Sequence, residues 1–522
     1  MTTTRANGVR WGAALVVATL LVGTPGVAAA DGRGKPCTAG AAGVGDPYFP
    51  TYGNGGYDVG NYDLDITYDP ATDRLDGEAS IRAKATETLC SFHLDLIGLD
   101  VSRIEVDHQD ATWTRDGQEL IVTPRRPLPD GHRFTVDVVY GGVPVTFEIP
   151  GFGLPAGFMT TPDGAIVAGQ PEVATAWFPV NDHPIDKASY TFDVTVPDGD
   201  EVVANGLLRR VRSRDGWTTW RWEAREPMAS YLATIDIGAW DVTSWETDAG
   251  LPVYDAVDSA ITGGLRAEID SSLARQDEVI ALLSAAFGPY PFRTAGGIVD
   301  NHDDLFFALE TQTRSVYSKY FWLDQEGNPT NGDFVVAHEM AHQWFGDDVA
   351  LARWQDIWLN EGFATYAEWL WAEYEGQATP DESFQATYDA FPADDPFWTV
   401  TIGDPGVTDL FSNPVYFRGA MTLHALRQAV GDDAFWTTIR EWAAENSGGN
   451  VTTEQFIALA EDVSGQQLDD LFTTWLFTPS RPDLTAAAST LGAAAAPDAA
   501  AASDAAAGWL AAARARLDRG RY

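Results

Sequence analysis

Residues 338–361 read HEMAHQWFGDDVALARWQDIWLNE, and this stretch decides how the whole chain is interpreted. His338 and His342 are four residues apart, so on a helix their imidazoles project from the same face, one turn apart. Glu361 follows after eighteen intervening residues, on a second predicted helix. Two histidines and one carboxylate are a typical ligand set for zinc, and three protein ligands leave a fourth position open. The stretch therefore predicts a catalytic zinc site and not a closed structural one.

Glu339 lies directly beside the first of these histidines, where its carboxylate can take a proton from a water molecule. The flanking residues are apolar or aromatic, with Phe334 and Val335 before the motif and Trp344 and Phe345 after it. The helix is therefore predicted to be buried, and buried histidines need polar partners, which a metal ion provides. The alternative is a surface helix that carries two solvated histidines.

Two segments of this region, HEMAHQWFG at 338–346 and WLNEGFA at 358–364, resemble the aminopeptidase N family of zinc metallopeptidases. The resemblance covers roughly residues 45–480. Members of the family are gluzincins, in which two histidines and one glutamate bind zinc. The resemblance implies that the two motif histidines and Glu361 hold one Zn²⁺ ion per chain, and that Glu339 acts as the base.

The chain departs from the family beside the zinc motif and in its length. An Asn usually follows the Phe-Gly of the motif, and this chain has Asp347 there. We expect this change to affect local hydrogen bonds in the loop and not the zinc site. Family members often carry a large C-terminal helical domain that encloses the active site, and this chain is too short to hold one. A more open cleft is therefore expected.

Tyr416 begins the segment Tyr-Phe-Arg-Gly-Ala at 416–420, which is similar to the Tyr-x-Lys-Gly-Ala segment of the family. In the family, the tyrosine hydroxyl donates to the oxyanion of the tetrahedral intermediate, opposite the zinc. The resemblance implies this catalytic role for Tyr416, with Arg418 keeping the charge of the usual lysine. The alternative is a structural aromatic residue at a helix start.

The resemblance also implies residues that bind the substrate. The Gly-x-Met-Glu-Asn segment of the family, whose glutamate binds the α-ammonium group, corresponds here to Phe-Ala-Leu-Glu-Thr around Glu310. The Gly, Met and Asn are not kept, so backbone contacts to the peptide are expected to differ. Glu172, at the end of Gly-Gln-Pro-Glu, matches a second anchor near the amine. Glu368 lies seven residues after Glu361 on the same helix face, where it is expected to hydrogen-bond a zinc-ligating histidine.

Alternating apolar and polar residues recur in short runs over residues 57–242, for example YDLDITY at 62–68. Gly, Pro and Asp clusters separate the runs, which is typical of a sandwich or saddle of many short strands. Apolar residues then recur at helical spacing over 265–287 and again from about 417 to 480. The predicted fold is therefore multidomain, with an N-terminal all-β saddle or sandwich domain followed by a mainly α, thermolysin-like zinc catalytic domain.

The predicted segments are a signal peptide at 1–30, the β domain at 31–242, the catalytic domain at 243–484 and an Ala-rich, disordered tail at 485–522. Arg5 and Arg10 precede an apolar run at 11–22, and small residues at 27–30 offer a cleavage site. This pattern predicts export by the general secretory route and an extracellular protein. The apolar run is shorter than the roughly 20 residues that a membrane-spanning helix needs.

Composition narrows the choice of partners. The chain has 76 acidic and 33 basic residues, a formal net charge of −43, which disfavours nucleic acid and anionic membranes. Its 45% hydrophobic and 12% aromatic residues fit a globular protein.

The only cysteines, Cys37 and Cys90, are an even pair in an exported chain and predict one disulfide. The alternative is two unpaired thiols.

The sequence as a whole predicts a secreted zinc aminopeptidase, expected to be monomeric, that acts on peptides with a free N-terminus. A zinc endopeptidase of thermolysin type shares the metal motif but would lack Glu310 and Glu172 as an amine clamp. Epoxide hydrolysis, known from a leukotriene-processing branch of the family, is a second alternative. A non-catalytic peptide-binding protein with a relic site is the third, and the complete set of ligands, base and tyrosine argues against it.

Overall fold

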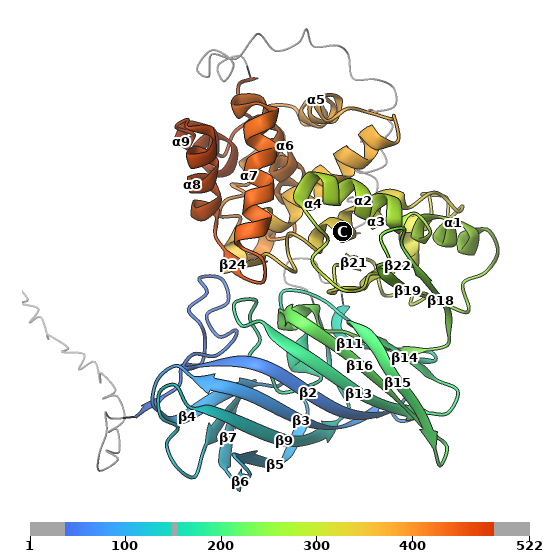
Figure 1. Cartoon of the computed structure of the whole chain (residues 1–522), viewed down its shortest axis with the longest axis vertical. Helices are drawn as coiled ribbons and strands as arrows, with labels where there is room; N and C mark the ends of the chain where they lie inside the picture. Colours follow the sequence, from blue (N-terminus) through green and yellow to red (C-terminus); the bar gives the residue numbers. More distant parts are fainter. Residues whose placement is uncertain (1–36, 149–154, 485–522) are drawn as a thin grey trace, which may run out of the picture.

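The computed structural model describes residues 37–148 and 155–484. The predicted signal peptide and the predicted Ala-rich tail lie outside the described residues. Figure 1 shows the sheets of the β domain at the bottom of the view and the helices of the second half of the chain above them. The predicted order, an N-terminal β-rich domain followed by a mainly helical one, is confirmed.

The largest sheet has eight strands in the order β15-β16-β13-β2-β3-β9-β5-β6. Along β2, the alternating side chains of Tyr62, Leu64 and Ile66 point into the core, as the period-two pattern predicts. The strands are β2 (Tyr57–Asp69), β3 (Arg74–Ala85), β5 (Asp100–Val106), β6 (Gln109–Asp110), β9 (Arg133–Gly142), β13 (Ala188–Pro197), β15 (Leu207–Arg214) and β16 (Trp217–Met228).

Two smaller sheets complete the β domain, with orders β10-β11-β12-β17-β14 and β1-β4-β8-β7. A disulfide joins Cys37 to Cys90 of β4, so the prediction of one disulfide is confirmed. The strands are β1 (Thr38–Ala39), β4 (Leu89–Asp95), β7 (Thr112–Asp116), β8 (Glu119–Thr123), β10 (Thr146–Glu148), β11 (Pro155–Thr161), β12 (Gly164–Ala168), β14 (Glu201–Ala204) and β17 (Ile235–Gly238).

The second half of the chain begins with a five-stranded sheet in the order β18-β19-β20-β22-β21. Its first strand spans the predicted domain boundary after residue 242, so that boundary stays a prediction. The strands are β18 (Trp240–Glu246), β19 (Pro252–Asp258), β20 (Gly297–Asp300), β21 (Ala308–Leu309) and β22 (Ser315–Ser318), and a further pair is β23 (Ala350–Leu351) with β24 (Asn450–Val451).

The helices that follow are mostly amphipathic or buried. They are α1 (Gly263–Leu273), α2 (Gln276–Phe287), α3 (Asp333–His342), α4 (Trp358–Tyr374), α5 (Pro380–Ala390), α6 (Asn413–Val430), α7 (Asp432–Glu445), α8 (Thr453–Ser464) and α9 (Asp469–Phe472).

The helical spacing over 265–287 corresponds to two helices, α1 and α2, because the chain turns between them at Ala274 and Arg275. The guanidinium of Arg275 forms ion pairs with Glu278, Asp333 and Glu375, two of which are distant in sequence. Tertiary contacts of this kind outweigh the helical periodicity of the local sequence.

Helices α4 and α6 cross closely enough that only glycine fits at their contact. A Cβ on Gly362 would lie 2.9 Å from the Cα of Gly419, and a Cβ on Gly419 would lie 2.7 Å from the Cα of Gly362. Gly362 directly follows Glu361, and Gly419 lies three residues after Tyr416. This close approach therefore brings a predicted metal ligand and the predicted oxyanion donor to the same region.

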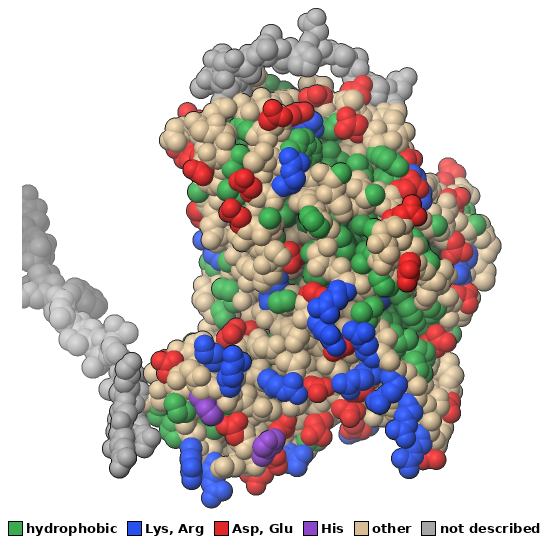
Figure 2. Space-filling model, in the orientation of Figure 1, with side chains coloured by type: hydrophobic (Ala, Val, Ile, Leu, Met, Phe, Trp, Pro, Cys, Tyr) green, Lys and Arg blue, Asp and Glu red, His purple; other side chains and the backbone are tan. Residues whose placement is uncertain are grey.

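Basic side chains gather on one face of this acidic protein. Figure 2 shows Lys and Arg concentrated over the β domain, around β15 and β16. Four arginines lie along the exposed edge strand β15, which is Leu207–Arg214. Charged side chains on an edge strand disfavour pairing with another chain, so they account for this cluster. Among the described residues, no helix is both long and apolar enough to cross a bilayer.

Candidate metal centre and substrate site

The three predicted metal ligands meet in the interior, between α3 and α4. His338 and His342 lie one turn apart on α3, and Glu361 lies in the first turn of α4. Oε2 of Glu361 is 3.4 Å from Nε2 of each histidine. All three side chains are buried, and one ligand atom from each lies within 4.8 Å of the others. The spacing seen in the sequence therefore produces one compact cluster.

The other nitrogen of each imidazole, Nδ1, lies within hydrogen-bonding distance of an acceptor. Nδ1 of His338 is 2.9 Å from Oε1 of Glu368, and Nδ1 of His342 is 3.0 Å from the carbonyl oxygen of Phe345. A proton held on Nδ1 by an acceptor leaves the lone pair of Nε2 free, as metal ligation requires. The structure places Glu368 where the sequence predicted a contact with a ligating histidine.

The residues present fit a zinc ion in both spacing and charge. Ligand bonds of roughly 2.1 Å at tetrahedral angles put neighbouring ligand atoms about 3.4 Å apart, which agrees with the two histidine–Glu361 distances. Burial raises the pKa of Glu361, but the neighbouring imidazoles outweigh burial and lower the pKa to about 2. Burial lowers the pKa of His338, but its contacts with Glu361 and Glu368 raise it overall to about 9. The cluster therefore stabilises positive charge at its centre.

Glu339 and Tyr416 border this cluster. Glu339 is buried, and burial raises the pKa of its carboxyl group to about 8, in spite of the two histidines that lower it. A carboxyl group whose pKa lies near neutrality suits proton transfer. The ring of Tyr416 stacks on the ring of His338 at a centroid distance of 6.0 Å. Pro414 lies in the first turn of α6 and favours its start there.

Arg418 has a structural role that the sequence did not indicate. Its guanidinium is buried and donates to the carbonyl oxygens of Trp398, Val400, Thr474 and Thr478. These hydrogen bonds hold two segments, around residues 398–400 and 474–478, against α6. Arg418 lies two residues after Tyr416 on that helix. Burial lowers the pKa of the Arg418 guanidinium to about 10. The side chain stabilises the fold around Tyr416.

Glu310 follows the short edge strand β21 and converges on the same site. One oxygen of Glu310, one oxygen of Glu339 and one nitrogen of His342 lie within 4.8 Å of one another. The carboxylate of Glu310 is buried and accepts a hydrogen bond of 2.9 Å from the hydroxyl of Tyr231. Among the described residues, no Lys or Arg forms an ion pair with Glu310. A buried carboxylate that has no basic side chain to pair with it suits a cationic ligand.

The turn after Glu310 is held by residues that the sequence analysis missed. The side chain of Gln343 accepts from the N–H of Thr313 at 2.7 Å and donates to the carbonyl oxygen of Glu310 at 3.3 Å. Gln343 directly follows His342, and this position beside the motif is the one sequence feature that points to it. Tyr231 is 79 residues from Glu310 in sequence, and no local pattern pointed to it.

Glu172 lies in the β domain, after the cis peptide bond between Gln170 and Pro171. Its carboxylate accepts a hydrogen bond from the hydroxyl of Thr175 at 3.2 Å. Burial raises its pKa, although a hydrogen bond from Tyr52 opposes the shift. Both partners, Thr175 and Tyr52, belong to the β domain. Among the described residues, Glu172 and Glu310 make no direct contact with each other.

Asp347, which stands where the family usually has Asn, is completely buried. Its N–H donates to the carbonyl oxygen of His342, and its own carbonyl oxygen accepts from Lys187 at 2.7 Å. Its carboxylate accepts no hydrogen bond from the described residues. Burial raises its pKa well above the usual range, with Glu310 acting in the same direction. The substitution therefore adds an acidic group beside the site.

Comparisons with known proteins agree with this geometry. Residues 287–475 match the profile of the Peptidase family M1 domain, and residues 59–232 match that of the Peptidase M1 N-terminal domain. The chain is similar to the crystal structure of an M1 zinc metallopeptidase from Deinococcus radiodurans, with 30% identity and a TM-score of 0.75. The match covers 85% of this chain and 99% of that one. A mutant of that protein bound to a Tyr-Ser-Ala substrate gives a TM-score of 0.76.

Longer relatives match over part of their length. Probable aminopeptidase 1 of Saccharolobus solfataricus is 25% identical over 413 residues, which are 75% of this chain and 50% of that protein. Aminopeptidase M1-D of Oryza sativa subsp. japonica is 25% identical over 447 residues, which are 79% of this chain and 49% of that protein. The chain spans about half the length of these two curated relatives.

Proposed function

The chain belongs to peptidase family M1, a family of zinc metallopeptidases, and we propose that it is a secreted aminopeptidase that removes residues from the N-terminus of peptides. The observation that carries this proposal is the convergence of Glu310 on the metal-ligand cluster. A buried carboxylate next to the cluster, without a basic side chain to pair with it, suits the free α-ammonium group of a peptide. Substrate binding at Glu310 would place the first peptide bond over the metal ligands.

His338, His342 and Glu361 would hold one zinc ion per chain. When bound, zinc acts as a Lewis acid and makes a water molecule easier to deprotonate. The carboxylate of Glu339 accepts the proton of the attacking water and delivers it to the leaving amine. The hydroxyl of Tyr416 donates a hydrogen bond to the carbonyl oxygen as it gains negative charge. Glu368 keeps the proton of His338 on Nδ1.

Glu310 gives this arrangement its selectivity for N-termini. A free α-ammonium group pairs with the buried carboxylate, whereas a blocked amine leaves that carboxylate desolvated and without a counter-charge. Glu172 would act as an outer anchor. It would contact the substrate, and it makes no direct contact with Glu310. The rival function, a zinc endopeptidase, has no use for a carboxylate in this position.

Export is supported by the sequence and by the disulfide. Arg5 and Arg10 with the apolar run at 11–22 are typical of a secretory signal. The bond between Cys37 and Cys90 is typical of proteins in oxidising compartments. We expect a monomer that acts on peptides outside the cytoplasm.

The experiment that tests the proposed function follows the products over time. Zinc-loaded protein is incubated with an unblocked hexapeptide, and the fragments are identified by mass spectrometry. The expected result is stepwise loss of single N-terminal residues, which stops in a chelator and returns with added zinc. Full activity in chelator, or early fragments cut in the middle of the peptide, would contradict the proposal.

A further inference from the structure

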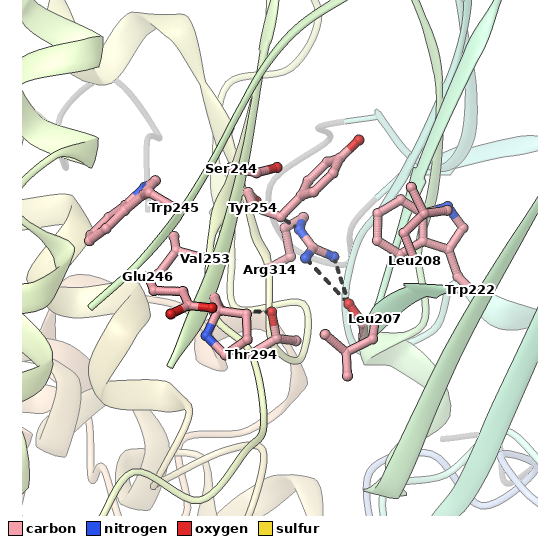
Figure 3. A pocket seen from close by; sticks show the side chains of 12 residues that line it. Leu207, Leu208, Trp222, Ser244, Trp245, Glu246, Val253, Tyr254, Thr294 and Arg314 are labelled. Carbon is pink, nitrogen blue, oxygen red and sulfur yellow. Dashed lines mark hydrogen bonds between the residues drawn. The ribbon is translucent and has the colours of Figure 1, made fainter. Parts of the chain in front are cut away.

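A cavity lies apart from the metal cluster, between the edge of the β domain and the first sheet of the second half of the chain. Its volume is about 350 Å³, at the lower end of the range of roughly 300–1,000 Å³ for small-molecule sites. Strands β15 and β16 form one wall, and β18 and β19 form the other. Figure 3 shows Arg314 at the centre of the lining, with Trp245 and Glu246 on one side and Leu207, Leu208 and Trp222 on the other.

Arg314 is a buried cation whose charge is favoured from a distance by Asp255 and Asp236. Its guanidinium lies 5.0 Å from the ring centroids of both Trp222 and Tyr254. It donates to the carbonyl oxygens of Tyr254, Ala204 and Gly206, and the bonds to Gly206 are long, at 3.3 Å. Among the described residues, no carboxylate forms an ion pair with it. A buried guanidinium held only by neutral acceptors attracts a carboxylate, because charge-assisted hydrogen bonds are roughly twice as strong.

The other features of the cavity define the rest of the ligand. Glu246, on the opposite side of Arg314 from Leu207 and Leu208, is exposed and makes no ion pair within the described part of the chain. The remaining walls are largely apolar or aromatic. One cation, one carboxylate and apolar walls within a small volume match a molecule that carries an ammonium, a carboxylate and an apolar side chain.

We propose that this cavity binds a free amino acid with an apolar side chain, with its carboxylate on Arg314 and its ammonium group on Glu246. Leu208 and Trp245 would contact the side chain, and Trp222 would cover the carboxylate. The binding itself does not depend on the proposed peptidase activity. If that activity holds, amino acids of this class are products of the enzyme.

The cavity is linked to the substrate site by one short turn. Gly206 donates its N–H to Oγ1 of Thr313 at 2.8 Å, and Asn205 donates its side-chain amide to the carbonyl oxygen of Gln312 at 2.9 Å. Thr313 adopts a positive φ of 71° and lies between Arg314 and Glu310. A ligand carboxylate on Arg314 would compete with the long bonds to Gly206 and loosen this turn. Occupancy of the cavity is therefore expected to weaken the anchor at Glu310, a consequence that rests on the proposed function.

The test of binding is calorimetric titration of the zinc-loaded full chain with L-leucine. The protein is compared with Glu246→Gln, with Leu208→Trp, which fills the cavity, and with Glu441→Gln, which removes an exposed carboxylate elsewhere. We expect the wild type and Glu441→Gln to bind leucine at the cavity. Glu246→Gln should weaken this binding at least about tenfold, the loss expected for one charged hydrogen bond. Leu208→Trp should abolish it.

Ligand analogues and activity separate the cavity from the metal site. Leucinol lacks the carboxylate and N-acetyl-leucine lacks the ammonium group, so each should bind the cavity at least about tenfold more weakly than leucine. The KM for a leucyl substrate should stay the same in Glu246→Gln, and inhibition by leucine should become purely competitive in Leu208→Trp. If the protein proves inactive on peptides, the titrations still test the binding.

Two results would overturn the proposal. One is a leucine isotherm that is the same in all four proteins, which would place all binding outside the cavity. The other is the absence of leucine density between Arg314 and Glu246 in crystals soaked with the amino acid. Glu246 is at the surface, so its replacement keeps the test valid even if the larger side chain at position 208 is not tolerated.

Discussion

The hydroxyl of Tyr231 donates a hydrogen bond of 2.9 Å to Oε1 of Glu310, and so joins a residue of the β domain to the proposed substrate anchor beside the proposed metal ligands. Tyr231 lies on a short 3-10 helix, Ser230–Leu232, and its ring packs against Trp354 at 5.3 Å. Both partners are buried. We therefore expect the β domain to take part in orienting the proposed anchor, with Tyr231 as a positioning residue.

Replacing Tyr231 by Phe tests this role. Glu310 would lose a hydrogen bond to a charged acceptor, which is worth about 1.5–3 kcal/mol. We expect KM for unblocked substrates to rise about tenfold or more, with a smaller change in kcat, because the reacting groups are untouched. Tyr140→Phe is the matched control, since the buried hydroxyl of Tyr140 has no partner among the described residues. Equal KM values in the two variants would remove Tyr231 from substrate binding.

Glu368→Gln tests the contact with Nδ1 of His338. The neutral amide holds the imidazole proton less strongly, so zinc affinity should fall by about 10- to 100-fold. Competition with a chelator of known affinity measures this change directly. Glu373→Gln, an exposed residue of the same helix, is the control and should bind zinc as the wild type does. A wild-type affinity in Glu368→Gln would show that the hydrogen bond has no influence on the metal.

Glu339→Gln and Tyr416→Phe separate chemistry from metal binding. Neither residue is one of the three ligands, so zinc content should stay at one ion per chain. Without the base, kcat should fall at least about a thousandfold. Without the hydroxyl of Tyr416, kcat should fall by roughly a hundredfold or more, as for other oxyanion donors. A Tyr416→Phe enzyme with nearly wild-type kcat would exclude the tyrosine from the mechanism.

Gly419→Ala tests the close contact of α4 and α6. The new Cβ would lie 2.7 Å from the Cα of Gly362, so the helices must separate, at a typical cost of about 1–3 kcal/mol in folding free energy. The separation would also move Tyr416 relative to Glu361, so kcat should fall together with the melting temperature. Gly60→Ala is the control, because its Cβ would meet its nearest atom at an ordinary 3.8 Å. Unchanged stability in Gly419→Ala would show that the helices adapt.

Local sequence patterns were enough to predict the metal cluster and the β domain. The positions of His338 and His342 follow from helical spacing alone, and the inward side chains of β2 follow from period-two alternation. Both patterns depend on neighbours within one element, which a single sequence displays. The contact of Glu368 with His338 was predictable for the same reason, since Glu368 and Glu361 share one face of α4.

Contacts between distant segments were not predictable. At the turn between α1 and α2, Arg275 pairs with Glu375, which is 100 residues away in the sequence. Two hydrogen bonds join the β domain to the second half of the chain in the same way. Tyr231 donates to Glu310, and Arg314 donates to the carbonyl oxygen of Gly206. Such contacts are fixed by the packing of the two halves, which no periodicity in the sequence records.

The central claim, that Glu310 makes this zinc enzyme an aminopeptidase, is tested most directly by a matched pair of peptides. The two have the same sequence, one with a free and one with an acetylated N-terminus, and kcat/KM is measured for both with the wild type and with Glu310→Ala. We predict that the wild type cleaves only the free peptide. Glu310→Ala should lower the kcat/KM for that peptide by a factor that corresponds to about 2–4 kcal/mol, the loss for breaking a buried charge pair. Efficient internal cleavage of the acetylated peptide by the wild type would contradict the account and favour an endopeptidase.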